Sequence, residues 1–287
     1  MLALYKKELK SYFIGMTGFV FIFLLLLLTG VFVTAYNLLL AYASIAYAVG
    51  SVQLCLMLTV PILTTRVIAE ERKNRTDQLL YSLPIPSVSI ILAKYLATVT
   101  VLLIPTALVA LYPVILSLFG SVPLFPSYTA LLGFFFLGAA LIALCSFLSS
   151  LTESQVIAAV VSFGVVLGLY LLPTLASMIP STAVASLLAL LVLLLVLGAV
   201  LYLVSKSLLV SVLTPGLLAV VTVAVYLVNA DLLTGLFPAL LGYLALFSRF
   251  ENFVSGILDL GAIVYYLSFS VFFLFLSTAS FEKKRYA

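Results

Sequence analysis

The chain has 287 residues, of which 66% are hydrophobic and only 8% are charged. A soluble domain is about half apolar and about a quarter charged, so this composition excludes a soluble enzyme and indicates an integral membrane protein. The absence of histidine from the sequence excludes histidine-based acid–base catalysis and histidine metal sites. Cys55 and Cys145 lie inside apolar stretches, where a packing role is more common than a disulfide or a redox pair.

Residues 1–13 are predicted to form an amphipathic helix that lies in the cytoplasmic surface of the membrane. The apolar residues of this segment recur at three- and four-residue spacing and are Leu2, Tyr5, Leu9, Tyr12 and Phe13. Lys6, Lys7 and Lys10 occupy the other face, as in helices that bind anionic membrane surfaces. The same lysines also act as a topology signal, and the two interpretations are compatible.

Long windows without a charged residue predict the membrane spans. The windows Ser11–Thr65, Tyr95–Thr152 and Ser154–Ser205 are each long enough for two helices of about 20 apolar residues. Ser207–Ala230 and Leu260–Phe281 each fit one such helix. We therefore predict an all-α, polytopic integral membrane helix bundle with about eight transmembrane spans. The spans are expected at approximately Ile14–Tyr36, Ala46–Ile68, Ser87–Leu118, Tyr128–Ser149, Ser154–Leu175, Ala183–Val204, Leu208–Val228 and Leu260–Ser280.

The segment between the second and third spans, Arg66–Ser87, is the most charged part of the chain. Good helix formers without an internal glycine predict a cytoplasmic helix over residues 67–86, and Pro84 and Pro86 end it because proline lacks an N–H donor. A plain connector between antiparallel helices usually has about 2–8 residues. We interpret this helix as a surface that a partner contacts; the alternative is a solvated, positively charged loop.

The segment 230–258 is predicted to lie on the external side. Its uncharged part, Leu232–Ser248, is short and contains Gly235 and Pro238, which favours an interfacial or re-entrant piece over a span. The charged residues that we expect in solvated external loops are Asp231, Arg249, Glu251 and Asp259.

The basic residues predict the orientation. With eight spans, all of the 13 basic residues except Arg249 fall on one side of the membrane. Basic loops face the cytoplasm, and an even number of spans places both termini there. We therefore expect a multi-pass protein of the cell membrane with cytoplasmic termini.

Three motif blocks occur at the ends of the predicted spans. They are Lys7-Glu8-Leu9-Lys10-Ser11-Tyr12-Phe13, then Pro61 to Pro84 with its Ile68-Ala69-Glu70-Glu71 core and the continuation Ala93-Lys94-Tyr95-Leu96-Ala97, and Phe250-Glu251-x-Phe253-x-x-Gly256-Ile257-x-Asp259. Together these blocks resemble the membrane subunits of ATP-binding-cassette exporters of the second class, in the gliding-motility-type permease branch. Six spans are usual in that family, so residues 183–228 are interpreted as an extra span pair.

The resemblance implies that the helix at 67–86 is a coupling helix, which docks on a separate cytoplasmic ATPase. The residues that it places at or near this interface are Arg66, Glu70, Glu71, Arg75, Asp77, Leu79, Leu80, Leu83 and Pro84. In such an interface, charge pairs would fix the position of the helix on the ATPase, and the leucines would bury apolar surface against it. The resemblance also implies a second permease copy or homologue, and two ATPase subunits per complex.

The chain is not expected to be an enzyme by itself. It contains no Gly-Lys dipeptide and therefore no phosphate-binding loop, so ATP and magnesium would be bound by the partner ATPase and no cofactor by this chain. The uncharged spans favour export of an amphipathic, peptide or drug-like substrate. Membrane lipid is an expected partner, and nucleic acid is not.

Two other functions stay open, an ion-coupled secondary transporter and a non-transporting membrane scaffold. Secondary transporters usually carry ionisable residues deep in their spans. Here the charges fall at the predicted span ends, and Lys94 is expected close enough to an end for its side chain to snorkel to the surface.

Overall fold

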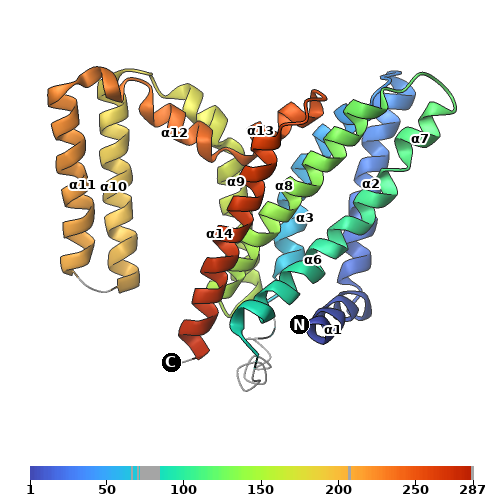
Figure 1. Cartoon of the computed structure of the whole chain (residues 1–287), viewed down its shortest axis with the longest axis horizontal. Coiled ribbons are helices and arrows are strands. Elements are labelled where there is room, and N and C mark those ends of the chain that lie inside the picture. The colour runs from blue at the N-terminus through green and yellow to red at the C-terminus, as the bar shows by residue number, and fades with distance from the viewer. Residues whose placement is uncertain (66, 70, 72–84, 206–207, 286–287) are drawn as a thin grey trace. The chain divides into compact units, whose positions relative to one another are not determined.

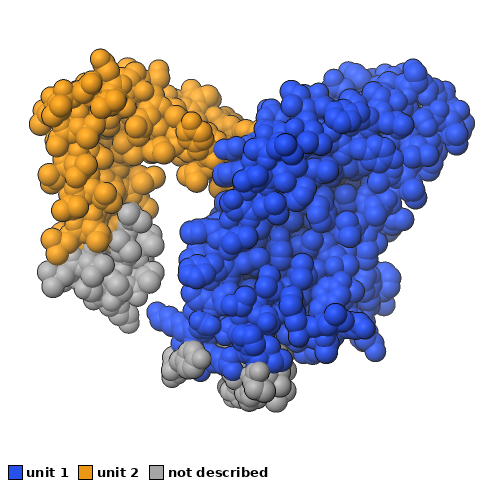
Figure 2. Space-filling view, viewed as in Figure 1, with its two compact units in different colours: residues 1–168, 249–287 blue, residues 169–248 orange. Residues whose placement is uncertain are grey.

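The computed structural model describes residues 1–65, 67–69, 71, 85–205 and 208–285, and these parts contain helices and no strands. The chain divides into two compact units (Figure 2). Unit 1 comprises Met1–Gly168 and Arg249–Ala287, and unit 2 comprises Leu169–Ser248. The predicted all-α membrane bundle is therefore confirmed.

Unit 1 begins with a short helix, α1, which is followed by the long apolar helices of the bundle (Figure 1). Its elements are α1 (Leu2–Ile14), α2 (Thr17–Val33), the π-helix η1 (Thr34–Leu39), α3 (Ala46–Thr64), α6 (Ser87–Val109), α7 (Tyr112–Ser117), α8 (Leu124–Leu151), the first part of α9 (Gln155–Met178), most of α13 (Leu246–Val254) and α14 (Leu260–Arg285). Pro86 directly precedes α6, and Pro123 directly precedes α8. Both prolines have an extended backbone conformation and cannot continue a preceding helix.

Helix α8 forms the centre of unit 1, because it packs against α3, α6 and α14 and 78% of its apolar stretch is buried. Small residues permit this close packing, as is usual between membrane helices. A Cβ atom on Gly133 would lie 2.5 Å from Cγ of Phe253, and one on Gly138 would lie 2.5 Å from Cδ2 of Leu102. The glycines of α8 therefore set how closely α6 and α13 approach it.

Unit 2 is a smaller set of helices. It holds the end of α9, then α10 (Ala183–Ser205), α11 (Leu208–Val228), the 3-10 helix η2 (Ala230–Leu233), α12 (Leu236–Leu244) and the first residues of α13. Helix α10 packs against α11, α12 and η2. The Asn229 side chain accepts a hydrogen bond from the backbone N–H of Asp231 and so caps η2.

Six helices in the described residues are long and apolar enough to cross a membrane, and a seventh would result if Ala230–Leu244 and Leu246–Val254, which meet at a sharp bend, formed one broken span. Helices α10 (23 residues) and α11 (21 residues) form where the extra pair was expected, and their described apolar stretches are Ala183–Val196 and Val212–Val228. The bent pair occupies the segment that was predicted to be interfacial or re-entrant.

Candidate functional site

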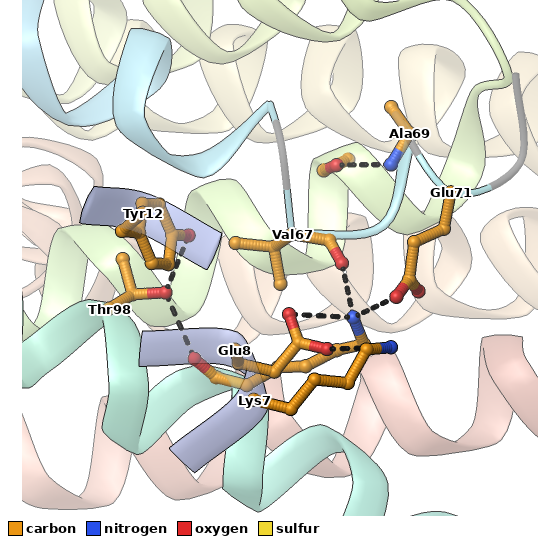
Figure 3. A network of polar contacts seen from close by, with 9 residues as sticks. Lys7, Glu8, Tyr12, Val67, Ala69, Glu71 and Thr98 are labelled. Atoms are coloured by element: carbon orange, nitrogen blue, oxygen red, sulfur yellow. Dashed lines mark hydrogen bonds and ion pairs between the residues drawn. The ribbon is translucent and has the colours of Figure 1, made fainter. Parts of the chain in front are cut away.

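The most buried charge in the described part of unit 1 belongs to Lys94, in the second turn of α6, whose exposed fraction is 2%. Its ammonium group donates a hydrogen bond to the backbone carbonyl oxygen of Val67 at 2.9 Å and pairs with Glu71 Oε1 at 2.8 Å. It also pairs with Glu8 Oε2 at 3.4 Å. An ammonium group has three donors, and three acceptors surround this one (Figure 3).

Lys94 was expected to lie close enough to a span end to snorkel, but its side chain is buried and does not extend to the surface. A lysine turns toward water when no acceptor lies nearby inside the protein, but α1 and the segment after α3 bring two carboxylates and a carbonyl to this position. The charge is neutralised internally, and the side chain joins α6 to two other segments of the chain.

The carboxylates of Glu8 and Glu71 both pair with the buried ammonium group of Lys94. The side chains of Glu8 and Glu71 are 13% and 16% exposed. Burial raises the pKa of Glu71, an effect that the positive charge of Lys94 opposes and the negative charge of Glu8 reinforces. The exposed Lys7 lies 3.8 Å from Glu8 Oε1 and adds a second positive charge at the rim of the cluster.

The backbone that carries Val67 and Glu71 is fixed to the bundle by further contacts. The backbone N–H of Ala69 donates to Oγ of Ser149, near the end of α8, at 3.1 Å. Val67 and Ile68 are buried in an apolar cluster. The other members of this cluster are Ile90, Ile91 and Phe281, with Leu4, Ile85 and Leu274 packed against them. The start of the segment after α3 therefore touches α1, α6, α8 and α14.

Helix α1 docks on α6 along its predicted apolar face. The hydroxyl groups of Tyr12 and Thr98 are 3.0 Å apart, and those of Tyr5 and Thr100 are 2.9 Å apart. Oγ1 of Thr98 in turn donates to the carbonyl oxygen of Lys94, which links this contact to the charge cluster (Figure 3). The lysines of α1 at positions 6, 7 and 10 are exposed, so the amphipathic pattern matches the way in which α1 packs.

At the other end of the bundle, the third motif block forms a corner before α14 that is held by buried rings and hydrogen bonds. The rings of Phe250 and Phe253 are fully buried. Asp259 caps α14 by accepting a hydrogen bond from the backbone N–H of Ala262 at 3.0 Å, and it accepts a second from Nδ2 of Asn252 at 2.9 Å. The bond from Asn252, followed by that from Ala262, lowers the pKa of Asp259.

Charged residues that were expected in solvated loops thus have structural contacts. Asp259 remains exposed to solvent, as predicted, but its carboxylate also caps α14. The guanidinium group of Arg249 lies 4.0 Å from the centre of the Tyr265 ring, a cation–π contact. In the described residues no group of three cysteine, aspartate or glutamate side chains could hold a metal ion.

Of the residues predicted at the ATPase interface, only Glu71 is described, and its carboxylate faces Lys94. The others lie outside the described residues; they are Arg66, Glu70, Arg75, Asp77, Leu79, Leu80, Leu83 and Pro84. The sequence reasoning missed Glu8 and Lys94 as site residues. A signal was present, because Glu8 is the only acidic residue before Glu70 and Lys94 borders a long uncharged window.

Comparison with known proteins identifies the family. The family model described as "ABC-2 family transporter protein" matches residues 2–214, a range that includes the whole Lys94 cluster. No match is found among curated proteins or among solved structures. Because the family model covers well over half of the chain, this multi-pass membrane protein belongs to the ABC-2 transporter family and is a permease subunit of that type.

Proposed function

We propose that this permease works with a separate ATP-binding-cassette ATPase, and that the Lys94 cluster connects the ATPase-binding segment to the spans. The observation that carries the proposal is the set of contacts at Lys94, whose ammonium group joins α6 to α1 and to the segment that leads into the predicted coupling helix. Family membership implies association with an ATP-binding-cassette subunit.

The energetics of a buried ion pair suit a mechanical connection. Removing one partner of such a pair usually costs about 3–5 kcal/mol, because the other charge is left uncompensated. Lys94 and Glu71 therefore resist separation, and movement of the segment at Val67–Glu71 carries α6 with it. The hydrogen bond from Ala69 to Ser149 extends the connection to α8, the central helix.

In the proposed cycle, ATP and magnesium bind to the partner subunits, and closure of the ATPases moves the helix at 67–86. The Lys94 cluster passes this movement to α1, α6 and α8, and the bundle rearranges to move its cargo. The basic residues of α1 and of the end of α14 support a cytoplasmic position for this end of the bundle. The apolar spans favour export of an amphipathic, peptide or drug-like molecule from the cell membrane.

The test is gentle purification of the tagged full chain from its native membrane, with measurement of ATP hydrolysis and identification of copurifying proteins. We expect a soluble subunit with a phosphate-binding loop. The variant Asp77→Arg, in the predicted coupling helix, should reduce its recovery. Glu153→Arg is the matched control, because Glu153 is exposed in the turn after α8 and lies on the same predicted side of the membrane.

Two results would contradict the proposal. A chain that purifies intact, alone and without ATP hydrolysis would have no ATPase partner. Equal recovery of the ATPase with Asp77→Arg and Glu153→Arg would place the docking surface elsewhere. Reversal of Glu71 is avoided in this test, because it would disrupt the pair with Lys94 as well as any docking contact.

The alternative of an ion-coupled secondary transporter gains one observation from the fold. A carboxylate with a raised pKa, Glu71, faces a buried lysine, a combination that proton-coupled transporters use. Glu71 lies beyond the end of α3, outside the spans, which favours the mechanical role. Transport by vesicles that continues with ATP after a protonophore has abolished the proton gradient would exclude this alternative.

A further inference from the structure

An apolar groove lies between the start of α6 and the last half of α14, with a volume of about 480 Å³. Val88, Ile91 and Leu92 line it from α6, and α14 lines it from Val271 to Glu282. We propose that this groove binds one phospholipid of the phosphatidylethanolamine type, with an acyl chain along α14 and the headgroup amine at Glu282.

The length of the groove fits one leaflet of a bilayer. At about 1.5 Å of rise per residue, the stretch Val271–Glu282 extends about 16 Å. The hydrocarbon core of a bilayer is about 30 Å thick, so one leaflet contributes about half of that. The groove is apolar at Val271 and Phe275 and becomes polar only at Thr278 and Glu282. This gradient follows the order of acyl chain and headgroup.

The charges at the polar end select the headgroup. Among the described residues, Glu282 is the only charged one that lines the groove. It is exposed and forms no ion pair with another described residue. The exposed Lys283 follows it, while Arg285 donates a hydrogen bond to the carbonyl oxygen of Ile85 at 3.1 Å. A headgroup amine therefore matches Glu282, whereas a lipid with no positive charge leaves this carboxylate without an opposite charge in the groove.

The groove adjoins the residues that hold the segment after α3. Ile91 and Leu274 line the groove and also pack in the apolar cluster with Val67 and Ile68. Ile91 is already buried, whereas Leu274 is partly exposed. A bound acyl chain would bury the side chain of Leu274 further and so stabilise the cluster. If the Lys94 cluster couples the ATPase to the spans, as proposed above, the bound lipid would regulate that coupling. The binding of the lipid to the groove does not depend on the proposed function.

The experiment uses the full chain in vesicles of phosphatidylethanolamine and phosphatidylglycerol that contain a photoactivatable phosphatidylethanolamine with a diazirine in its acyl chain. Peptides labelled after irradiation are identified by mass spectrometry. We expect labels within 88–92 and 271–279, and about a tenfold decrease with Ala279→Phe, which fills the groove and so displaces the chain. Ser268→Phe is the matched control, since Ser268 is an exposed residue of α14 outside the groove.

The headgroup is tested with Glu282→Gln, which keeps the shape of the side chain and removes its charge. In the original protein, unlabelled phosphatidylethanolamine should displace the probe better than phosphatidylglycerol does. In Glu282→Gln, this preference for phosphatidylethanolamine should fall about threefold. Labelling spread evenly over α14, equal labelling with Ala279→Phe and Ser268→Phe, or an unchanged headgroup preference would each overturn the proposal. A crosslink from the groove to a second copy of the chain would also overturn it.

Discussion

Lys94 shows how a single charged residue can be stable at the foot of a membrane bundle. Its side chain is 1% exposed, and its ammonium group has acceptors in Val67, Glu71 and Glu8. The pairs compensate the free energy that desolvation of the charge requires. Because the acceptors come from two other segments, the stability of this residue depends on the assembled fold.

The variant Lys94→Met should strongly destabilise the protein. It keeps the length of the side chain but leaves two largely buried carboxylates without their cation, so we expect a loss of about 3 kcal/mol in the free energy of unfolding. Thermal unfolding in detergent measures the effect. Lys10→Met, at an exposed position of α1, should change little. A double variant with Glu71→Gln should recover part of the loss, and additive losses would show that the two residues do not interact.

Asp259 should give the corner before α14 a pH dependence. Its pKa is lowered by the bonds from Asn252 and Ala262, so the stabilisation is complete above the ordinary pKa of an aspartate. It is lost as the pH falls through the lowered value. Asp259→Ala should reduce stability by about 1 kcal/mol at neutral pH, as for other N-cap residues. The difference between the two proteins should shrink in acid; a constant difference from neutral to acidic pH would contradict the assignment.

At the scale of helices, close packing around α8 depends on glycine. Gly133 faces the ring of Phe253, and any side chain there would overlap it. At Gly164 in α9, no described atom beyond the adjacent residues and the nearby backbone of the helix lies within 4 Å of the position of an added Cβ atom. Two glycines in similar apolar helices thus have different roles, which sequence spacing does not reveal.

The pair Gly133→Ala and Gly164→Ala tests this difference. The first variant should lose about 1–3 kcal/mol, because an added methyl group forces the packed helices apart. The second should be neutral or slightly stabilising, because alanine favours helix more than glycine does. Melting temperatures in the same detergent compare them, and equal destabilisation by both would mean that α8 and α13 are not packed closely.

The hydroxyl contacts between α1 and α6 make a further prediction at this scale. Tyr12→Phe removes the bond with Thr98 and should weaken the docking of α1 by about 1 kcal/mol. Proteolysis of the N-terminal residues of the folded protein should then become faster. Tyr47→Phe is a suitable control, because Tyr47 is exposed on α3. Unchanged proteolysis would show that the apolar face alone holds α1.

For the whole molecule, the sequence predicts the class of fold and the positions of most helices. Uncharged windows of sufficient length must form helices in a bilayer, and for this reason α8, α9 and α14 begin near the expected residues. Periodicity likewise predicts α1. The number of spans does not follow in the same way, because proline and glycine between Leu232 and Ser248 fit both a broken span and a surface segment.

The Lys94 cluster could not be predicted in the same way. Charge patterns along a chain show which residues avoid the membrane core, but they do not show that Glu8 and Glu71 both pair with Lys94. That arrangement depends on how α1 docks and where α3 ends. Local hydrophobicity therefore predicts elements well, whereas partners of buried polar groups follow from tertiary packing.

The central claim is that the Lys94 cluster links an ATPase to the spans. The most direct measurement compares ATP hydrolysis by the complete complex, with the original chain and with Lys94→Met, against hydrolysis by the isolated ATPase subunit. We predict that the ATPase copurifies with both chains, that the original permease changes its rate, and that the variant returns the rate to that of the isolated subunit. A Lys94→Met complex that is folded and hydrolyses ATP at the same rate as the original complex would contradict the account.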